Sequence, residues 1–292
     1  MTTNSNTRGR ALEYCICAEI ARRFPSSSFS DHAAADNRRD KPLFDGLSPD
    51  LKSDFSKCAS IVAQWLVGKL ERSDAEFEID RLPDRGGIAG DPTDIRIGVE
   101  GGGIINLSIK NRKPSFKHQR LTRLPEQCGI TNHKIASKYT SEHDRIWDGF
   151  YSLIKQKRPD ARLYKDVDDL TFKHLYQPFV RLVIHFLNSN KSSAPKFFKF
   201  LKGKVNYYMV ENAEDEVRIY DLFNPRVPAT MSAKRINDNN ISLEFDNGWR
   251  MNLRIHTASK RLYTAQGKPN RSVKMDTTVP DLETFSHEIF RK

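Results

Sequence analysis

The 292-residue sequence contains no long hydrophobic run, and this absence excludes several kinds of protein. No stretch approaches the roughly 18 to 20 consecutive apolar residues that a membrane-spanning helix needs. The N-terminal residues Met1–Arg10 are polar and basic and lack the apolar segment of a secretory signal peptide. With 38% hydrophobic residues, the chain still has enough apolar material for a core. We therefore expect a cytoplasmic protein that has no membrane partner.

Cysteine is scarce, with four residues in the whole chain: Cys15, Cys17, Cys58 and Cys128. None of them forms a C-x-x-C pair, and no further cysteine or histidine cluster lies at the spacing of zinc ligands. Cys15 and Cys17 fall within an apolar helical pattern. The sequence therefore predicts core thiols in a reducing compartment and no structural zinc site.

Positive charge is in excess. The sequence has 48 Lys and Arg residues against 37 Asp and Glu residues, which gives a formal net charge of +11. Because each phosphate contact by Lys or Arg releases condensed counterions, a basic chain of this kind favours a polyanionic partner. A basic surface without a specific partner is the alternative, and the distribution of the charges along the chain decides between them.

Apolar residues at helical spacing predict several helices. In the first of them, Leu12, Ile16 and Ile20 recur at i, i+4 and i+8. The predicted helices cover residues Gly9–Phe24, Leu51–Glu71, Ile135–Lys157, Leu170–Asn188 and Lys196–Lys202. The polar segment Ser26–Pro49 has little periodicity, so we expect an exposed loop there with at most a short helix.

Strand-like alternation marks two other parts of the chain. Asp94–Val99 and Ile104–Lys110 flank a glycine-rich turn and predict a hairpin, and Phe77 begins a possible shorter strand before it. Strands in the last third are predicted at Val205–Val210, Glu216–Leu222, Ile241–Phe245, Trp249–His256 and Ser272–Thr278. These elements indicate an α+β fold, with a core over residues 1–200 and a β-rich C-terminal region over 201–292 that packs on this core and contributes to DNA binding.

Two residues of the hairpin form a pattern typical of metal-dependent phosphodiester hydrolysis. That reaction needs oxygen ligands for Mg²⁺, a nucleophilic water and a cation near the scissile phosphate. Asp94 opens the first strand and Lys110 closes the second, sixteen residues later. Neighbouring strands can direct two such side chains to one place. The alternative is a turn-forming aspartate and a solvated lysine at a strand end.

The hairpin resembles the catalytic motif of the PD-(D/E)xK nuclease superfamily. Ser108 departs from it, because the superfamily usually has a carboxylate at this position. Many of these nucleases have a glutamate on the first helix that faces the metal, so the resemblance implies that Glu13 completes the site. Alternatively, Glu13 is an exposed glutamate favoured by the helix dipole. Asp91 is a weaker candidate ligand, and a turn before Pro92 accounts for it equally well.

Basic residues are concentrated directly after Lys110. Six Lys or Arg residues lie between positions 110 and 123, and no acid follows before Glu126. Such side chains contact phosphates and the edges of bases in the major groove. The predicted DNA-contacting residues of this segment are Arg112, Lys113, Lys117, His118, Gln119, Arg120 and Arg123.

Further features resemble the HaeIII family of type II restriction endonucleases. They are the segments Gly9–Tyr14, Gly90–Asp94, Ser108–Lys110, Lys117–Leu121, Gly248–Ser259 and Ser272–Asp276. The resemblance implies a mixed β-sheet flanked by helices, and a homodimer that cuts double-stranded DNA at a short sequence, with GGCC as the suggested target. The implied cofactor is Mg²⁺, with Mn²⁺ as a possible substitute, held by Asp94 and Glu13, while Lys110 orients the water or stabilises the transition state.

Two other functions are compatible with the same residues. One is a structure- or modification-directed DNA nuclease of the same fold. The other is a non-catalytic DNA-binding protein in which Asp94 and Lys110 are incidental. Loss of DNA cleavage with retained DNA binding, on replacement of either residue, separates the nucleases from the binding protein.

The strand Trp249–His256 has two chemically different faces. Apolar residues alternate on one of them, namely Met251, Leu253 and Ile255. Polar residues share the other, namely Arg250, Asn252, Arg254 and His256. A polar face of this kind can lie against DNA, and the alternative is a half-exposed strand of an antiparallel sheet.

Overall fold

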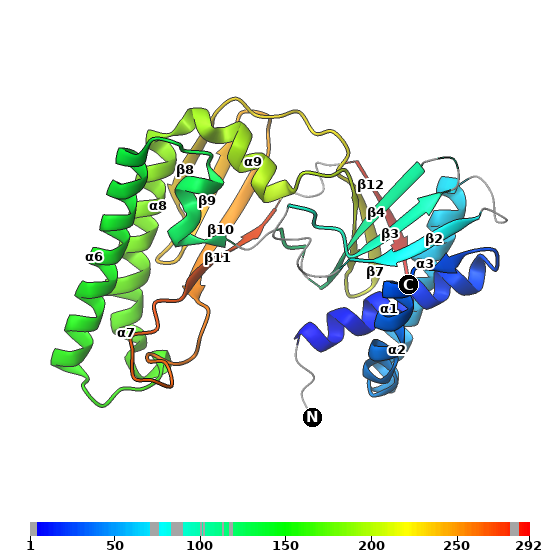
Figure 1. The fold of residues 1–292 in the computed structure, drawn as a ribbon, viewed down its shortest axis with the longest axis horizontal. Coiled ribbons are helices and arrows are strands. Elements are labelled where there is room, and N and C mark those ends of the chain that lie inside the picture. Colours follow the sequence, from blue (N-terminus) through cyan, green and yellow to red (C-terminus); the bar gives the residue numbers. More distant parts are fainter. Residues whose placement is uncertain are drawn as a thin grey trace. The chain divides into compact units, whose positions relative to one another are not determined.

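A computed structural model describes residues 5–70, 76–82, 90–99, 101, 103–112, 114–116, 119–280 and 286–292. The chain divides into two units that each draw on distant parts of the sequence. Unit 1 consists of Met1–Pro114, Lys204–Pro225 and Leu282–Lys292, and unit 2 of Ser115–Gly203 and Arg226–Asp281. Each unit contains its own sheet and helices, as Figure 1 shows, and the fold is α+β as predicted.

Unit 1 is built on a seven-stranded mixed sheet with the order β1-β2-β3-β4-β6-β7-β12. The strands are β1 Ser28–Phe29, β2 Phe77–Arg81, β3 Ile95–Val99, β4 Gly103–Asn111, β6 Tyr208–Asn212, β7 Glu216–Asp221 and β12 His287–Arg291. The β1–β2 and β4–β6 pairs are parallel, and the other neighbours are antiparallel. The predicted hairpin is confirmed, because β3 pairs with β4 from Ile95 opposite Leu107 to Val99 opposite Gly103.

Three helices accompany this sheet: α1 Ser5–Arg23, α2 Asp31–Asp45 and α3 Pro49–Leu70. The predicted apolar stripe of α1 is fully buried, and it belongs to a core shared with α3 and the hairpin strands. In Figure 1 these helices lie together beside the sheet of unit 1. The core thus covers one face of the sheet and fixes α1 next to the hairpin.

The segment Ser26–Pro49 corrects the prediction of an exposed loop with at most a short helix. Most of it forms α2, which is 15 residues long. Ser30 caps this helix, with its hydroxyl accepting a hydrogen bond of 3.1 Å from the backbone N–H of Ala33. The buried side chains of α2 include the charged Asp40. The buried positions of α2 are a small alanine and a charged aspartate instead of a row of large apolar residues, which is why periodicity did not reveal this helix.

Unit 2 contains a five-stranded antiparallel sheet with the order β5-β11-β10-β9-β8. Its strands are β5 Gln119–Arg120, β8 Met231–Arg235, β9 Asn240–Phe245, β10 Arg250–Thr257 and β11 Val273–Thr278. Its longer helices are α6 His133–Lys157, α8 Gln177–Ser189 and α9 Ala194–Lys202, each close to a predicted helix. Figure 1 shows α8 between α6 and the sheet, and α8 packs on β8.

The units do not follow the expected division into residues 1–200 and 201–292. Parallel pairing of β6 with β4 brings residues after 203 into the sheet of unit 1. Residues 115–203 instead combine with β8 to β11 in unit 2. Parallel pairing between strands about 100 residues apart leaves no local mark in the sequence.

All four cysteines are buried free thiols, which confirms the prediction of core thiols for Cys15 and Cys17. Burial raises the pKa of the Cys58 and Cys128 thiols to about 12 in each case. Among the residues that the structure describes, no helix combines the length and apolar character needed to cross a membrane.

Candidate active site

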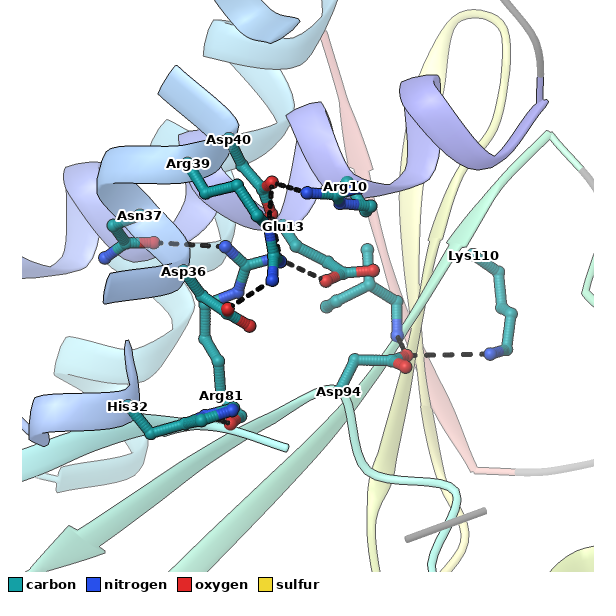
Figure 2. Close-up of polar contacts among 11 residues, drawn as sticks. Arg10, Glu13, His32, Asp36, Asn37, Arg39, Asp40, Arg81, Asp94 and Lys110 are labelled. Carbon is teal, nitrogen blue, oxygen red and sulfur yellow. Dashed lines mark hydrogen bonds and ion pairs between the residues drawn. The ribbon is translucent and has the colours of Figure 1, made fainter. Parts of the chain in front are cut away.

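Asp94 lies where the hairpin begins, one residue before β3. Its backbone N–H donates to the carbonyl of Leu107 at 2.9 Å, which ties it to β4. Its Oδ2 accepts hydrogen bonds from the backbone N–H of Ile109 at 2.6 Å and from the hydroxyl of Ser108 at 3.3 Å. The carboxylate is therefore held against the end of β4, as Figure 2 shows.

Lys110 approaches the same carboxylate from the end of β4. Its Nζ lies 3.6 Å from Oδ2 of Asp94, and the two side chains are 21% and 29% exposed. Within the described residues, all three of these contacts to the Asp94 side chain use Oδ2, so Oδ1 is available to a ligand. The residue that precedes β3 and a residue near the end of β4 are thus brought to one partly open place.

Glu13 reaches this place from α1. Figure 2 shows its side chain extending between Arg81 and Asp94. Oε2 of Glu13 accepts a hydrogen bond of 2.7 Å from Arg81, and the side chain is 22% exposed. Burial and the negative charge of Asp94 raise the pKa of Glu13 to about 7, against the opposing effect of Arg81 and Lys110. Glu13 and Asp94 therefore present their carboxylates to the same place, as Figure 2 shows.

A buried charge network supports Glu13 from behind. Arg81, at 2% exposure, also lies 3.0 Å from the fully buried Asp40 and 3.3 Å from the side-chain oxygen of Asn37. Asp40 is further paired with Arg10 and, at 2.9 Å, with Arg39. Burial opposes ionisation of Asp40, but hydrogen bonds from Arg39 and Arg10 and the charge of Arg81 outweigh it and lower its pKa to about 2.

Arg81 and Asp40 are functional-site residues that were not predicted from the sequence. The strand pattern did contain a signal for Arg81, because Phe77, Ile79 and Arg81 alternate along β2 and all three are buried. A charged residue in register with core positions indicates a buried ion pair. No comparable signal marks Asp40.

Asp91 has the turn-forming role, which was the alternative to that of a metal ligand. Its Oδ1 accepts a hydrogen bond of 3.0 Å from the backbone N–H of Thr93, and its Oδ2 pairs with Arg96 at 2.6 Å. Both carboxylate oxygens are therefore engaged. Asp91 does not join Asp94 and Glu13 in the contacts of the candidate site.

The chemistry of the cluster fits a magnesium ion. Two neighbouring carboxylates that repel each other supply hard oxygen ligands, and a cation between them relieves the repulsion. Glu13 uses Oε2 for Arg81, and its Oε1 has no hydrogen bond to another residue that the structure describes. Within the described residues no group of three or more His, Cys, Asp or Glu side chains could hold a metal. Magnesium tolerates such a small set, because it commonly keeps several waters and one or two carboxylates.

The predicted DNA-contacting residues that the structure describes are divided between the two units. Arg112 belongs to unit 1, has a positive φ of 68° and pairs with Asp54 at 3.3 Å. Arg120 and Arg123 belong to unit 2 and are exposed, and Arg123 pairs with Glu126. Lys113, Lys117 and His118 lie outside the described residues.

Gln119 corrects the prediction of a DNA-contacting side chain. It is 1% exposed, and its amide donates to the hydroxyl of Thr277 inside unit 2. The residue lies in β5, where it pairs with Met275 of β11. Alternation along the strand turns Gln119 inward and Arg120 outward.

Comparison with known proteins assigns no family to this chain. A scan against protein-family models finds no matching family, and a search of the curated proteins finds no match.

Proposed function

We propose that this protein is a magnesium-dependent endonuclease that hydrolyses phosphodiester bonds of double-stranded DNA. The observation that carries the proposal is the meeting of Asp94 and Lys110 at the end of the hairpin, with Glu13 joining them from α1. Two carboxylates and one lysine at a partly open sheet end match the ligands and the cation that this chemistry requires. The geometry supports these three residues as the catalytic centre.

Each residue has a distinct task in this proposal. Asp94 and Glu13 hold the metal, and the hydrogen bonds from Ile109 and Ser108 orient the Asp94 carboxylate. Bound magnesium, or manganese in its place, supplies Lewis-acid chemistry and a nucleophile at neutral pH. Lys110 offsets the negative charge that grows on the phosphate oxygens, or holds the attacking water. Arg81 positions Glu13 and keeps one of its oxygens engaged.

Ser108 has a supporting role here. It is 1% exposed and donates a hydrogen bond to Asp94 instead of supplying a carboxylate. The charge that is absent from position 108 comes in this proposal from Glu13. Ser108→Ala then weakens the orientation of Asp94 but preserves both proposed metal ligands.

A type II restriction endonuclease is the form of this activity that we propose. Such an enzyme cuts both strands at a short sequence, and a homodimer suits a two-fold symmetric target. Digestion of a plasmid of known sequence, with all fragment ends mapped, tests this form directly. Cutting at one recurring short sequence supports it, and cutting governed by DNA structure or base modification replaces it with the alternative nuclease.

Substitutions at the cluster test the catalytic assignment. Asp94→Asn preserves an oxygen that accepts from Ile109 but removes the charge, and Lys110→Met removes the cation while keeping a similar length. We expect cleavage to fall by about 100-fold or more in each, with DNA binding retained. Lys57→Met, at an exposed position of α3 in the same unit, serves as the control and should cut normally. A wild-type protein that binds DNA but leaves it intact with magnesium or manganese supports the non-catalytic alternative instead.

A further inference from the structure

The sheet of unit 2 has one covered face and one open face. The covered face consists of buried, mostly apolar residues that recur at every second position: Met231, Ala233, Ile241, Leu243, Phe245, Met251, Leu253, Ile255, Val273, Met275 and Thr277. Helix α8 packs on this side, against β8 and β9. The alternate residues of the same strands therefore project from the other face, where they are partly or fully exposed.

The open face is polar and carries more positive than negative charge. Its cationic side chains are Arg120, Lys234, Arg250, Arg254 and Lys274, and its carboxylates are Glu244 and Asp276. Glu244 lies within 4 Å of two of the cations, Lys234 at 3.4 Å and Arg250 at 3.7 Å. Asp276 lies 2.7 Å from His256 and 3.6 Å from Lys274. Two cations of the face remain outside these pairs.

Those two cations are Arg254 and Arg120. Both are exposed, and neither forms an ion pair with a residue that the structure describes. Arg254 is in the centre of the sheet, where its register partners are Asn240 on β9 and Asp276 on β11. Arg120 lies opposite Lys274 at the edge formed by β5. The unpaired charge therefore extends from the middle of the sheet to its β5 edge.

We infer that this open face, centred on Arg254, is a docking surface for double-stranded DNA. The inference rests on the proposed function for its choice of DNA as the substrate. Charge complementarity supports it, since phosphates pair with exposed guanidinium and ammonium groups. Arginine and asparagine are also the side chains that read guanine and adenine edges, and Asn252 adjoins Arg254 on the same face. Catalysis and part of the DNA binding are thereby assigned to different units.

The width of the sheet limits how DNA can contact it. Five strands span roughly 20 Å, whereas the major groove is about 12 Å wide. The whole sheet therefore cannot enter a groove. Lys274 and Arg120 near the β5 edge are assigned to phosphates, and Arg254 and Asn252 near the middle to the base edges that long side chains reach.

Binding assays with single substitutions test the surface. A fluorescent 30-base-pair duplex is titrated with full-length protein in EDTA, which prevents cleavage, at several salt concentrations. Arg254→Met should weaken binding about tenfold or more, and Arg120→Met should lower the salt dependence by about one released counterion. The matched control is Arg181→Met on α8, because Arg181 is also an exposed arginine but lies on the helical side, and binding should be unchanged.

A second measurement does not depend on charge. Because the four native cysteines are buried, R254C and R181C each introduce one exposed thiol. Saturating duplex should slow alkylation of the R254C thiol and leave that of R181C unaffected. Equal alkylation with and without DNA in both variants, together with wild-type affinity of R254M, overturns the inference.

The outcomes separate this inference from the nuclease proposal. If wild-type protein binds the duplex through this face but never cuts it, the nuclease proposal is contradicted and the docking surface is supported. If wild-type protein cuts DNA normally while R254M and R120M bind DNA like wild type, the docking surface is contradicted and the nuclease proposal is supported. Tighter binding to an RNA duplex or to vesicles of anionic lipid than to DNA overturns DNA as the occupant.

Discussion

The two sheets of this protein carry their charges in opposite ways. In unit 1, Arg81 is 2% exposed and lies between Glu13 and the fully buried Asp40. In unit 2, Arg254 projects from an uncovered face, and the ion pair between Lys234 and Glu244 joins side chains that are 69% and 36% exposed. Buried charges must be compensated by partners, while exposed charges are compensated by water. Unit 1 can therefore hold charged side chains in fixed positions, whereas the charged side chains of unit 2 are accessible to a binding partner.

The largest effect that tests this contrast is expected from Arg81→Met. The substitution removes one partner from a buried network and leaves Asp40 and Glu13 with one cation fewer. Breaking a buried pair in this way costs about 3 to 5 kcal/mol, so the free energy of unfolding should fall by that amount in urea titrations. The control is Arg96→Met, whose side chain is 34% exposed and pairs with Asp91. We expect it to cost about 1 kcal/mol or less.

Equal losses in these two variants contradict the contrast between buried and exposed charge. Arg81→Lys adds a finer test, since it keeps the positive charge but lacks the forked donors that face Glu13 and Asp40. Its stability should lie between those of wild type and Arg81→Met.

The pH dependence of stability should show the next largest effect. The raised pKa of Glu13 means that the folded state binds its proton more tightly than the unfolded state. The stability that this proton binding adds to the folded state is fully present below about pH 4.5 and is lost as pH rises through about 7. In metal-free protein we expect a loss of about 2 kcal/mol between pH 5 and 8.

Glu13→Gln isolates this contribution because it has no proton to lose. The difference in unfolding free energy between wild type and this variant should change with pH by the amount just given. Asp40 acts with the opposite sign, because its lowered pKa adds stability above about pH 4 that disappears as pH falls toward 2. If the unfolding free energies of wild type and Glu13→Gln change in parallel from pH 5 to 8, the Glu13 carboxylate is not buried beside the negative charge of Asp94.

Magnesium should stabilise unit 1 by a smaller amount. At a tenfold excess over its dissociation constant, a ligand that binds only the folded state adds about 1.4 kcal/mol. The rise in melting temperature should be larger at pH 8 than at pH 6, because metal competes with the proton on Glu13. Asp94→Asn should abolish the rise, and Asp45→Asn, which removes an exposed acid on α2, should preserve it.

The local pattern of the sequence was sufficient to predict the hairpin and to nominate Asp94 and Lys110, which the structure brings together. Strand alternation and a glycine-rich turn act over a few residues, so they can be read directly. The first helix was equally readable, since its apolar stripe was complete. Glu13 could be placed near the hairpin only through resemblance, because helix-to-sheet packing is a tertiary property.

The elements that escaped prediction have buried polar groups or distant partners. Helix α2 buries Asp40 where an apolar residue would have given a periodic signal. Gln119 belongs to a strand of two residues, too short for alternation to be recognised, and its amide is satisfied by Thr277 of a strand far along the chain. The division into units depends on the β4–β6 pairing, which only the folded chain shows.

The smallest effect on stability is expected from Arg254→Met. An exposed side chain without an ion pair among the described residues should change the free energy of unfolding by about 0.5 kcal/mol or less. Urea titration side by side with Arg81→Met measures both arginines on one scale. If Arg254→Met destabilises the fold by several kcal/mol, its guanidinium belongs to a structural network, and the open face loses its distinction from the interior of unit 1. If stability is unchanged while affinity for DNA falls, the two sheets differ in function as they do in burial. The charges of unit 1 are then fixed in buried ion pairs, and those of unit 2 are exposed and bind DNA.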